Sequence, residues 1–516
     1  MTARRTTAGR MAAALLLLTL PSLALANWTA TGRFVYQDRV QDQTGFTGVD
    51  PQKSMRFVDV QIIDNAGTKL LAKGATDANG NFSIPVVDNK TRTVYVRALS
   101  QSLNTSGLWV DVQNGSSQFY ALASSNISSH NPNTSVNFGT LMAAKGSGGE
   151  AFNLYDQVVY GADYIAFLRG SRPPQVDDLT VLWKSNRGVM DSNYQSALRN
   201  LSMRDTGGYD DTVVLHEMGH YFLYEYSRSD NPAGAHTFTD CNIDLRLAWD
   251  EGFGTYWGNS VLRYFGLPNP HLYIRTSGTT GTGGVVRYAN LEADSQYTCQ
   301  GATSEVDVFQ FLWDINDTSA TADGIAGDDD LLIEPDSQTW EVMRDYFPGA
   351  AVTNRCLEDY WDGWFKSPIS NGHLTDMRDI SSRVGVLYSE DSFEVNNTVA
   401  TASPAIVGGS VAATFFSDPD GDGAGQADTD NYWLSTASGI SYTIQTTNLL
   451  GDGNTFLELL DTNGTTVLAS NDDRAAGDQS SLVSWTAPRS DTFYIRVTHT
   501  ADTGIYGSYQ LAVTSP

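Results

Sequence analysis

The sequence predicts a multidomain protein in which an α+β central domain is flanked by two all-β domains. Three observations lead to this prediction. A length of 516 residues corresponds to about three domains. Both ends show short alternating strands separated by turns, whereas the middle carries longer apolar segments with helical spacing. We place the domains at residues 27–140, 148–388 and 391–516, after a leader at residues 1–26.

The leader has the features of a secretory signal peptide. Arginines precede an apolar run from Met11 to Leu20, and Ala24-Leu25-Ala26 is a small-residue cleavage site. This run is too short for a stable membrane anchor, and no later apolar stretch reaches about 18 residues. We therefore expect a secreted protein that is extracellular, or periplasmic in transit.

The chain is strongly acidic, with 32 Lys and Arg against 59 Asp and Glu and a net charge of −27. Such a charge opposes binding to nucleic acid or to anionic membrane surfaces. Its many aspartates favour turns and sites for hard cations such as Ca²⁺. Cys241, Cys299 and Cys356 allow three different single disulfides, and the pair Cys241 and Cys299 brackets the region of Glu251.

The N-terminal domain is expected to consist of strands and turns. Val58, Val60 and Ile62 alternate with polar residues, and Asp77-Ala78-Asn79-Gly80 marks a turn before the next strand. The stretch from Thr76 to Ile84 resembles the transthyretin-like, carboxypeptidase regulatory-like β-sandwich. That resemblance implies a folding or spacing module without a ligand of its own.

The central domain is expected to be mainly helical, with one short strand. A helix that begins at Asp210 or Asp211 and ends near Ser229 is the most strongly apolar of them. The other expected elements are helices at Ala151–Leu168, around Glu251, at Val306–Trp313, at Trp340–Met343 and at Cys356–Phe365, and a strand at Leu179–Trp183.

The most informative segment is His216-Glu217-Met218-Gly219-His220. Positions i and i+4 share one face of a helix, so His216 and His220 can bind one zinc ion. Glu217 lies beside them and is placed to accept a proton from the metal-bound water. Zinc in a catalytic site needs a third protein ligand, for which Glu251 on the next predicted helix is the best candidate.

These four residues resemble the pattern of the gluzincins, in which two helices supply His, His and Glu to zinc. Trp249-Asp250-Glu251-Gly252-Phe253 is similar to the Glu-Gly motif of the second helix in such families. The resemblance implies a thermolysin-like catalytic domain. The interval from His220 to Glu251 is longer than in thermolysin and closer to that of bacterial collagenases. A metzincin site is excluded by Leu223 and Tyr226, which occupy the positions of its glycine and third histidine.

The expected mechanism follows from these ligands. Zinc would lower the pKa of its water and polarise the scissile carbonyl, while Glu217 would act as general base. Asp250 is a candidate partner for a ligand histidine, and Thr255 stands where thermolysin has a supporting carboxylate. His236 is a candidate for the cleft wall. The candidate oxyanion donors are His236, His271, Tyr288, Tyr297 and His373.

Four blocks after Asp391 resemble the bacterial pre-peptidase C-terminal domain, a β-sandwich found on secreted peptidases. They begin at Asp391, Asp428, Phe456 and Phe493. By this resemblance the candidate calcium ligands are Glu394, Asn396, Asp428 and Asp430, since Ca²⁺ prefers several oxygen ligands. The loop from Asp418 begins like an EF-hand, but its twelfth position is Thr429 instead of Glu.

The sequence thus predicts a secreted zinc metallopeptidase that hydrolyses proteins or peptides, with an endopeptidase as the leading hypothesis. The alternatives are a zinc exopeptidase, a collagenase-like enzyme, or a catalytically inactive extracellular binding protein. The oligomeric state stays open.

Overall fold

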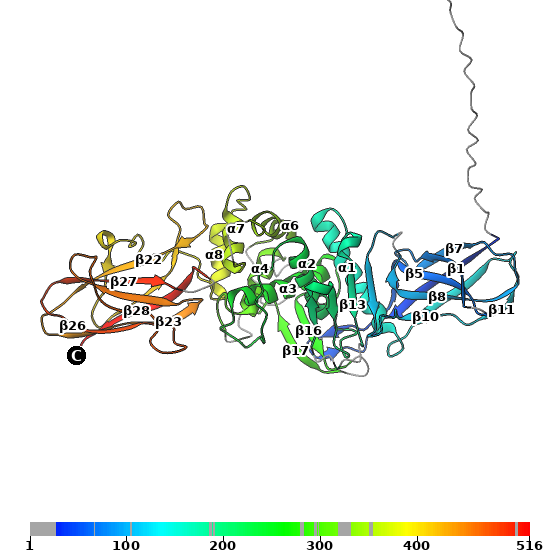
Figure 1. Ribbon diagram of the computed structural model, residues 1–516, viewed down its shortest axis with the longest axis horizontal. Coiled ribbons are helices and arrows are strands. Elements are labelled where there is room, and N and C mark those ends of the chain that lie inside the picture. Colours follow the sequence, from blue (N-terminus) through cyan, green and yellow to red (C-terminus); the bar gives the residue numbers. More distant parts are fainter. Residues whose placement is uncertain are drawn as a thin grey trace, which may run out of the picture.

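A computed structural model arranges the chain as three regions in a row, with helices in the middle and strands at both ends (Figure 1). It describes residues 27–66, 68–103, 106–184, 188, 191–278, 283–293, 297, 299–317, 332–349, 354–500 and 504–516. The predicted signal peptide, residues 1–26, lies outside this description. Within the described residues, none of the helices combines the length and the apolar character needed to cross a membrane. The protein is multidomain and rich in β-structure.

Two large β-sheets and the short β2–β3 pair form the N-terminal region. Phe82 and Ile84 on β7 are buried while their strand neighbours are exposed. On β5, Val58, Val60 and Ile62 are buried as predicted, but Asp59, Ile63 and Asp64 are buried too. The preceding turn ends at Gly80, whose φ of 77° suits glycine, and the Asp77 carboxylate accepts the backbone N–H of Asn79. The strands are β1 (Trp28–Gln37), β2 (Gln41–Asp42), β3 (Gly45–Phe46), β4 (Gln52–Ser54), β5 (Val58–Asp64), β6 (Lys69–Ala75), β7 (Asn81–Val86), β8 (Arg92–Ser102), β9 (Val110–Gln113), β10 (Ala121–Ala123), β11 (Ile127–His130) and β12 (Val136–Ala143).

One of these sheets continues into the central region, in the order β14-β15-β13-β9-β8-β5-β6. Strand β13 runs parallel to β9, with Leu179 opposite Val110. The expected boundary between 27–140 and 148–388 therefore divides the sequence but not the sheet. Periodicity cannot foresee this, because pairing joins strands that are distant in the chain. The added strands are β13 (Leu179–Leu182), β14 (Asn193–Gln195) and β15 (Asn200–Ser202).

The central helices lie largely where the sequence predicts them. Helix α2 ends at Tyr226 instead of near Ser229. Asp210 occupies its N-cap position, but the carboxylate accepts hydrogen bonds from Arg204 and Thr276 and not from the helix's own N–H groups. Helix α8 was not predicted, because most of its residues are polar. The helices are α1 (Gly149–Arg169), α2 (Asp211–Tyr226), α3 (Leu245–Tyr264), α4 (Glu305–Asn316), α6 (Asp336–Glu341) followed by a π-helical turn (Val342–Tyr346), α7 (Leu357–Phe365) and α8 (Leu374–Arg383).

A β-hairpin and a disulfide complete the central region. Strands β16 (Leu272–Thr276) and β17 (Val285–Asn290) pair antiparallel, and β16 contacts α2. Cys241 and Cys299 form the disulfide, and Cys356 is a buried free thiol. Of the three pairings that the sequence allows, the structure contains the one that ties the segment before α3 to the segment before α4.

Two sheets pack face to face as a C-terminal β-sandwich, with the orders β18-β22-β27-β24-β25 and β19-β28-β23-β26 and a core of their own. The sandwich contacts α7, where the Glu358 carboxylate accepts the N–H groups of Ile505 and Tyr506. Trp361 donates its indole N–H to the carbonyl of Gly423. The strands are β18 (Ser403–Pro404), β19 (Ser410–Thr414), β20 (Phe416–Ser417), β21 (Gln426–Ala427), β22 (Thr429–Ser435), β23 (Ser441–Gly451), β24 (Thr455–Leu460), β25 (Val467–Asn471), β26 (Leu482–Thr486), β27 (Thr492–His499) and β28 (Gly507–Thr514).

Candidate metal centre and cleft

Two glycines allow α2 and α3 to cross at close range. A Cβ added to Gly219 would lie 2.8 Å from the Cα of Gly254, and one added to Gly254 would lie 3.2 Å from the carbonyl oxygen of His216. A larger residue at Gly219 would therefore push the helices apart. Their crossing brings the face of α2 that carries His216 and His220 against Glu251 on α3.

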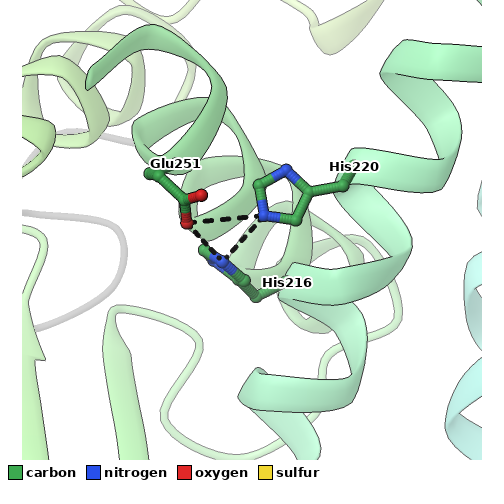
Figure 2. Close-up of side chains that lie close together, drawn as sticks. All are labelled: His216, His220 and Glu251. Carbon is green, nitrogen blue, oxygen red and sulfur yellow. Dashed lines mark hydrogen bonds and ion pairs between the residues drawn. The ribbon is translucent and has the colours of Figure 1, made fainter. Parts of the chain in front are cut away.

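Three donor atoms from these helices converge on one point (Figure 2). The Nε2 atoms of His216 and His220 are 3.1 Å apart, and Glu251 Oε2 lies 3.2 Å from the first and 3.5 Å from the second. For ligands about 2.0–2.1 Å from an ion, a tetrahedron places neighbouring donors roughly 3.3–3.4 Å apart. The triangle of donors has the size of one face of a tetrahedral zinc site.

The other ring nitrogen of each histidine already has a partner. His220 Nδ1 lies 2.6 Å from Asp250 Oδ1, and His216 Nδ1 lies 2.9 Å from Thr255 Oγ1. Because an ionised carboxylate only accepts hydrogen bonds, His220 donates from Nδ1 to Asp250, and its Nε2 atom is directed at the cluster. Ser229 donates its hydroxyl to the second oxygen of Asp250. Asp250 thus lies at the supporting position named from the sequence, and Thr255 supports the other imidazole.

The electrostatics of the cluster suit a cation. Burial lowers the pKa of His216, so its imidazole is neutral, which is the form that binds metal ions. Burial would raise the pKa of Glu251, but the adjacent His220, His216 and His236 hold this pKa well below its usual range. Burial would lower the pKa of His220, but the charge of Glu251 and the hydrogen bond to Asp250 raise it well above its usual range. The cluster thus favours a positive charge beside Glu251, and a divalent ion would take the place of the His220 proton. The residues therefore fit a divalent ion with nitrogen and oxygen ligands.

Glu217 lines the same cleft, which has a volume of about 670 Å³ and lies between β14 and the loop after α2. Burial raises the pKa of Glu217 to about 8; the charge of His220 opposes this shift, and Glu251 and Asp191 add to it. A carboxyl group whose pKa is near neutrality can accept a proton and return it within one reaction cycle.

His236, on the loop after α2, also reaches the donor cluster. Its Nε2 atom is 3.2 Å from Glu251 Oε2 and 3.8 Å from Glu305 Oε2. Burial lowers the pKa of His236, but the hydrogen bond and charge of Glu251 outweigh this and raise it to about 9. His236, Glu251 and Glu305 therefore form a second donor group that shares one oxygen with the first.

The other candidate oxyanion donors do not line this cleft. His373 pairs with Glu334 beside α8, at 3.2 Å. The Tyr297 hydroxyl donates to the carbonyl of Tyr288, and His271 precedes β16.

Tyr273 on β16 lines the cleft, although the sequence analysis did not single it out. Its ring centroid lies 5.9 Å from that of His216. Its hydroxyl has no hydrogen-bond partner among the described residues, so it is available to a ligand. No signal in the sequence distinguishes this tyrosine from one in an ordinary strand, because its position depends on how the hairpin packs against α2.

A second cluster, made of oxygen atoms, contains the four candidate calcium ligands. Asn396 and Tyr509 donate to the two carboxylate oxygens of Asp430, at 2.9 and 2.7 Å. Glu394 Oε1, Asn396 Oδ1 and Asp428 Oδ2 are buried and have no hydrogen-bond partner among the described residues. Burial and the neighbouring Asp428 raise the pKa of Glu394 to about 9, and burial raises that of Asp430 to about 8. Such acceptors fit a hard cation such as Ca²⁺.

Two further acidic features occur in the C-terminal region, and one of them adjoins this cluster. The carboxylate of Asp391 lies within 4.8 Å of those of Glu394 and Asp430. The loop that resembled the start of an EF-hand also gathers carboxylates, but its buried member Asp418 is paired with Arg378 at 3.3 Å. We therefore treat the cluster around Glu394 as the candidate calcium site.

Comparison with known proteins identifies the C-terminal sandwich. Residues 428–499 match the family model of the bacterial pre-peptidase C-terminal domain. A stretch of 154 residues is 27% identical to an uncharacterized protein of Archaeoglobus fulgidus and covers 28% of this chain. The chain spans only 40% of the length of that relative.

Two solved structures resemble parts of the chain. The pre-peptidase C-terminal domain of a Bacillus anthracis collagenase is 18% identical, with 22% of this chain and 93% of that chain covered and a TM-score of 0.17. A periplasmic inhibitor of g-type lysozyme from Aeromonas hydrophila is 17% identical, with 21% and 85% covered and a TM-score of 0.16. The family match therefore identifies one domain, and the chemistry of the central region has to be argued from its own residues.

Proposed function

We propose that the chain is a secreted zinc-dependent peptidase of the gluzincin type, with a thermolysin-like central domain, that cleaves extracellular proteins internally. The observation that carries the proposal is the convergence of His216, His220 and Glu251 beside the buried Glu217 in a large cleft. Peptide hydrolysis requires an activated water, a base next to it and space for an extended chain. These residues and the cleft offer all three.

Zinc held by the three donor residues would supply a water of lowered pKa and a Lewis acid for the scissile carbonyl. Glu217 would take the proton of the attacking water and pass it to the leaving amine. Asp250 and Thr255 hold the imidazoles of His220 and His216 in one orientation. Both imidazoles are thereby positioned before substrate arrives.

The oxyanion that develops on the substrate carbonyl needs a hydrogen-bond donor in addition to the metal. Tyr273 suits this role because its hydroxyl lines the cleft without a partner among the described residues. His236 is the second candidate, since it lines the cleft beside Glu251.

The cleft wall supports an extended substrate. Asn193 and Tyr194 belong to β14, the edge strand of the nine-stranded sheet, and both line the cleft. An edge strand leaves backbone N–H and C=O groups with which an extended peptide can pair. Such pairing favours protein and peptide substrates and suits cleavage within a chain.

Secretion is supported by two features besides the predicted signal peptide. The bacterial pre-peptidase C-terminal domain takes its name from its occurrence beside peptidases. The disulfide between Cys241 and Cys299 is of a kind that persists in oxidising compartments outside the cytosol. Both fit an enzyme that acts outside the cell.

The proposal is tested by comparing the wild type with Glu217→Gln in casein hydrolysis, with zinc content measured on the same samples. We expect activity to fall by at least about 10²- to 10⁴-fold while zinc stays near one ion per chain, because only the base is lost. Glu225→Gln is the matched control. It makes the same change on α2, at a carboxylate that pairs with Arg199 at 2.8 Å and does not line the cleft.

The outcomes separate the possible functions. Equal hydrolysis by wild type and Glu217→Gln would refute the role of Glu217. If zinc is bound but neither protein cuts, the chain is a latent precursor or a binding protein. Product masses decide between internal cleavage and removal of one residue at a time, as an exopeptidase would do.

We also propose that Glu394, Asn396, Asp428 and Asp430 bind calcium and that the ion stabilises the C-terminal sandwich. The support is the set of buried oxygens without hydrogen-bond partners among the described residues. A bound Ca²⁺ would satisfy them together and relieve the mutual repulsion of the carboxylates.

A further inference from the structure

Two arginines lie directly opposite each other on the β16–β17 hairpin. Arg275 pairs with Arg287 across the strands, and both side chains line the cleft of the candidate metal centre. Like charges in directly opposed positions destabilise a sheet. In a chain with a net charge of −27, such a pair needs neighbouring acids or a role of its own.

The two arginines differ in their partners. Arg275 forms an ion pair with Asp191 at 2.6 Å, and only 14% of its side chain is exposed. No carboxylate of the described residues lies within 4.0 Å of Arg287. Asp191 thus neutralises the charge of Arg275, whereas the charge of Arg287 faces the cleft without an ion-pair partner among the described residues.

An aromatic platform holds the guanidinium of Arg287. Its Cζ atom lies 5.0 Å from the ring centroid of Phe238, within the range of a cation–π contact. Phe238 is buried and packs edge-on against Tyr273 and Tyr297, with centroid separations of 5.4 and 5.8 Å. This packing limits how far the platform can move.

The platform connects Arg287 to the donor cluster. Phe238 contacts Tyr273, whose ring centroid is 5.9 Å from that of His216. Two aromatic rings, those of Phe238 and Tyr273, therefore lie between Arg287 and the candidate metal ligand His216 along one wall of the cleft. A group bound by this arginine would sit beside the reacting bond of a substrate and not at the bond itself.

We propose that Arg287 forms an anion-binding subsite that takes a carboxylate of the substrate, so that the cleft selects peptides with a carboxylate near the scissile bond. This inference rests on the proposed peptidase function. A guanidinium matches a carboxylate because two parallel N–H groups meet its two oxygens. In a peptide that group is either an Asp or Glu side chain or the terminal carboxylate.

The test uses a peptide library of one sequence in which Glu replaces Gln at each position flanking the cleaved bond, and each peptide is made with a free or an amidated C-terminus. We expect the wild type to cleave one type of carboxylate-bearing peptide with a kcat/KM about 10- to 100-fold above that of its neutral counterpart, which carries Gln or an amidated terminus. A preference for the Glu peptides assigns a side-chain subsite. A preference for the free terminus assigns a terminal one.

Variants connect the preference to Arg287. Arg287→Gln should bring the ratio of carboxylate to neutral peptide close to 1, and Arg287→Lys should restore part of it, because charge returns without the planar fork. Arg275→Gln is the matched control, since it removes the same charge from the same cleft at a position already paired with Asp191. It should retain the preference.

A binding measurement separates failure of the subsite from failure of the peptidase. Fluorescence anisotropy of the labelled Glu and Gln peptides is measured on Glu217→Gln, with and without Arg287→Gln. Tighter binding of the carboxylate peptide that depends on Arg287, without cleavage by the wild type, would uphold the subsite and refute the peptidase. Cleavage without a carboxylate preference, or with one that survives Arg287→Gln, would overturn the subsite alone.

Discussion

The candidate metal centre on the helices and the oxygen cluster of the C-terminal sandwich are built in opposite ways. Two helices supply the donors of the first site, which are His216, His220 and Glu251. The Nδ1 atoms of both imidazoles, which face away from the site, have hydrogen-bond partners. Glu394 and Asp428 come from loops, and each keeps a buried oxygen without a partner among the described residues.

This difference indicates what each ion would do. At the helical site, hydrogen bonds from neighbouring residues already orient the ligands, so a bound ion would act in catalysis and would not be needed to hold the fold together. The oxygen cluster has carboxylates that repel one another, so the ion would contribute stability there. Loss of a ligand should therefore remove activity at the first centre and lower stability at the second.

The largest expected effect is loss of zinc from His220→Ala. Zinc affinity should fall by more than the roughly 100-fold that loss of an outer hydrogen-bond partner costs, because a donor atom disappears. His236→Ala, which removes an imidazole 3.2 Å from Glu251, should keep the ion. Zinc content after dialysis against a chelator checks both. The reverse result would place the metal between His236, Glu251 and Glu305.

A half-buried carboxylate outside both clusters provides a reference for an acid whose pKa is raised mainly by burial, against hydrogen bonds from Thr180 and Gln113 that lower it. Burial raises the pKa of Asp111 on β9 to about 6. Because the folded pKa is raised, the stability associated with this group is fully present below about pH 4 and is lost as the pH rises through about 6. A shift of about two pKa units corresponds to about 3 kcal/mol.

Asp111→Asn should remove this loss. Relative to the wild type, the free energy of unfolding of the variant should rise between pH 4 and pH 7.5, by at most about 3 kcal/mol. Denaturant unfolding at several pH values measures the difference. Parallel pH profiles for the two proteins would show that the carboxyl group of Asp111 ionises in the fold without penalty.

Calcium should stabilise the C-terminal sandwich by about 2.7 kcal/mol when its concentration is 100 times the dissociation constant. Asp428→Ala should abolish this gain, because it removes a buried oxygen of the cluster. Asp473→Ala deletes an equal charge at an exposed position of the same domain and should preserve the gain. Thermal unfolding of the full chain with and without calcium is the measurement. Equal shifts in both variants would exclude the cluster as the binding site.

The smallest expected effects concern the supporting shell. Asp250→Asn should lower zinc affinity or activity by about 10- to 100-fold, since His220 loses its charged partner. Thr255→Val should have a smaller effect, because its hydrogen bond to His216 involves a neutral hydroxyl. Competition with a zinc-binding dye ranks the two variants. A larger loss from Thr255→Val would contradict the assumed order.

Much of the helical architecture was predictable from sequence. Helix α1 lies close to its expected position, because its apolar segment is long and ends at Gly170. The short strand β13 also lies close to its expected position, with Leu179 and Val181 buried. Helix α8 was not predicted because it is short and mostly polar, although its few apolar residues, Leu374, Met377 and Ile380, do recur with helical spacing. The continuation of the N-terminal sheet through β13 was equally hidden, because nothing in either strand specifies its partner.

The sequence by itself placed His216 and His220 on one helix face and named Glu251, because helical spacing and local motifs are properties of neighbouring residues. Only the tertiary structure decided that Cys241 pairs with Cys299, that Thr255 supports His216, and that Tyr273 and Arg287 line the cleft. These contacts join segments far apart in the chain, and they depend on how the hairpin and helices pack. Local residue patterns do not determine that packing.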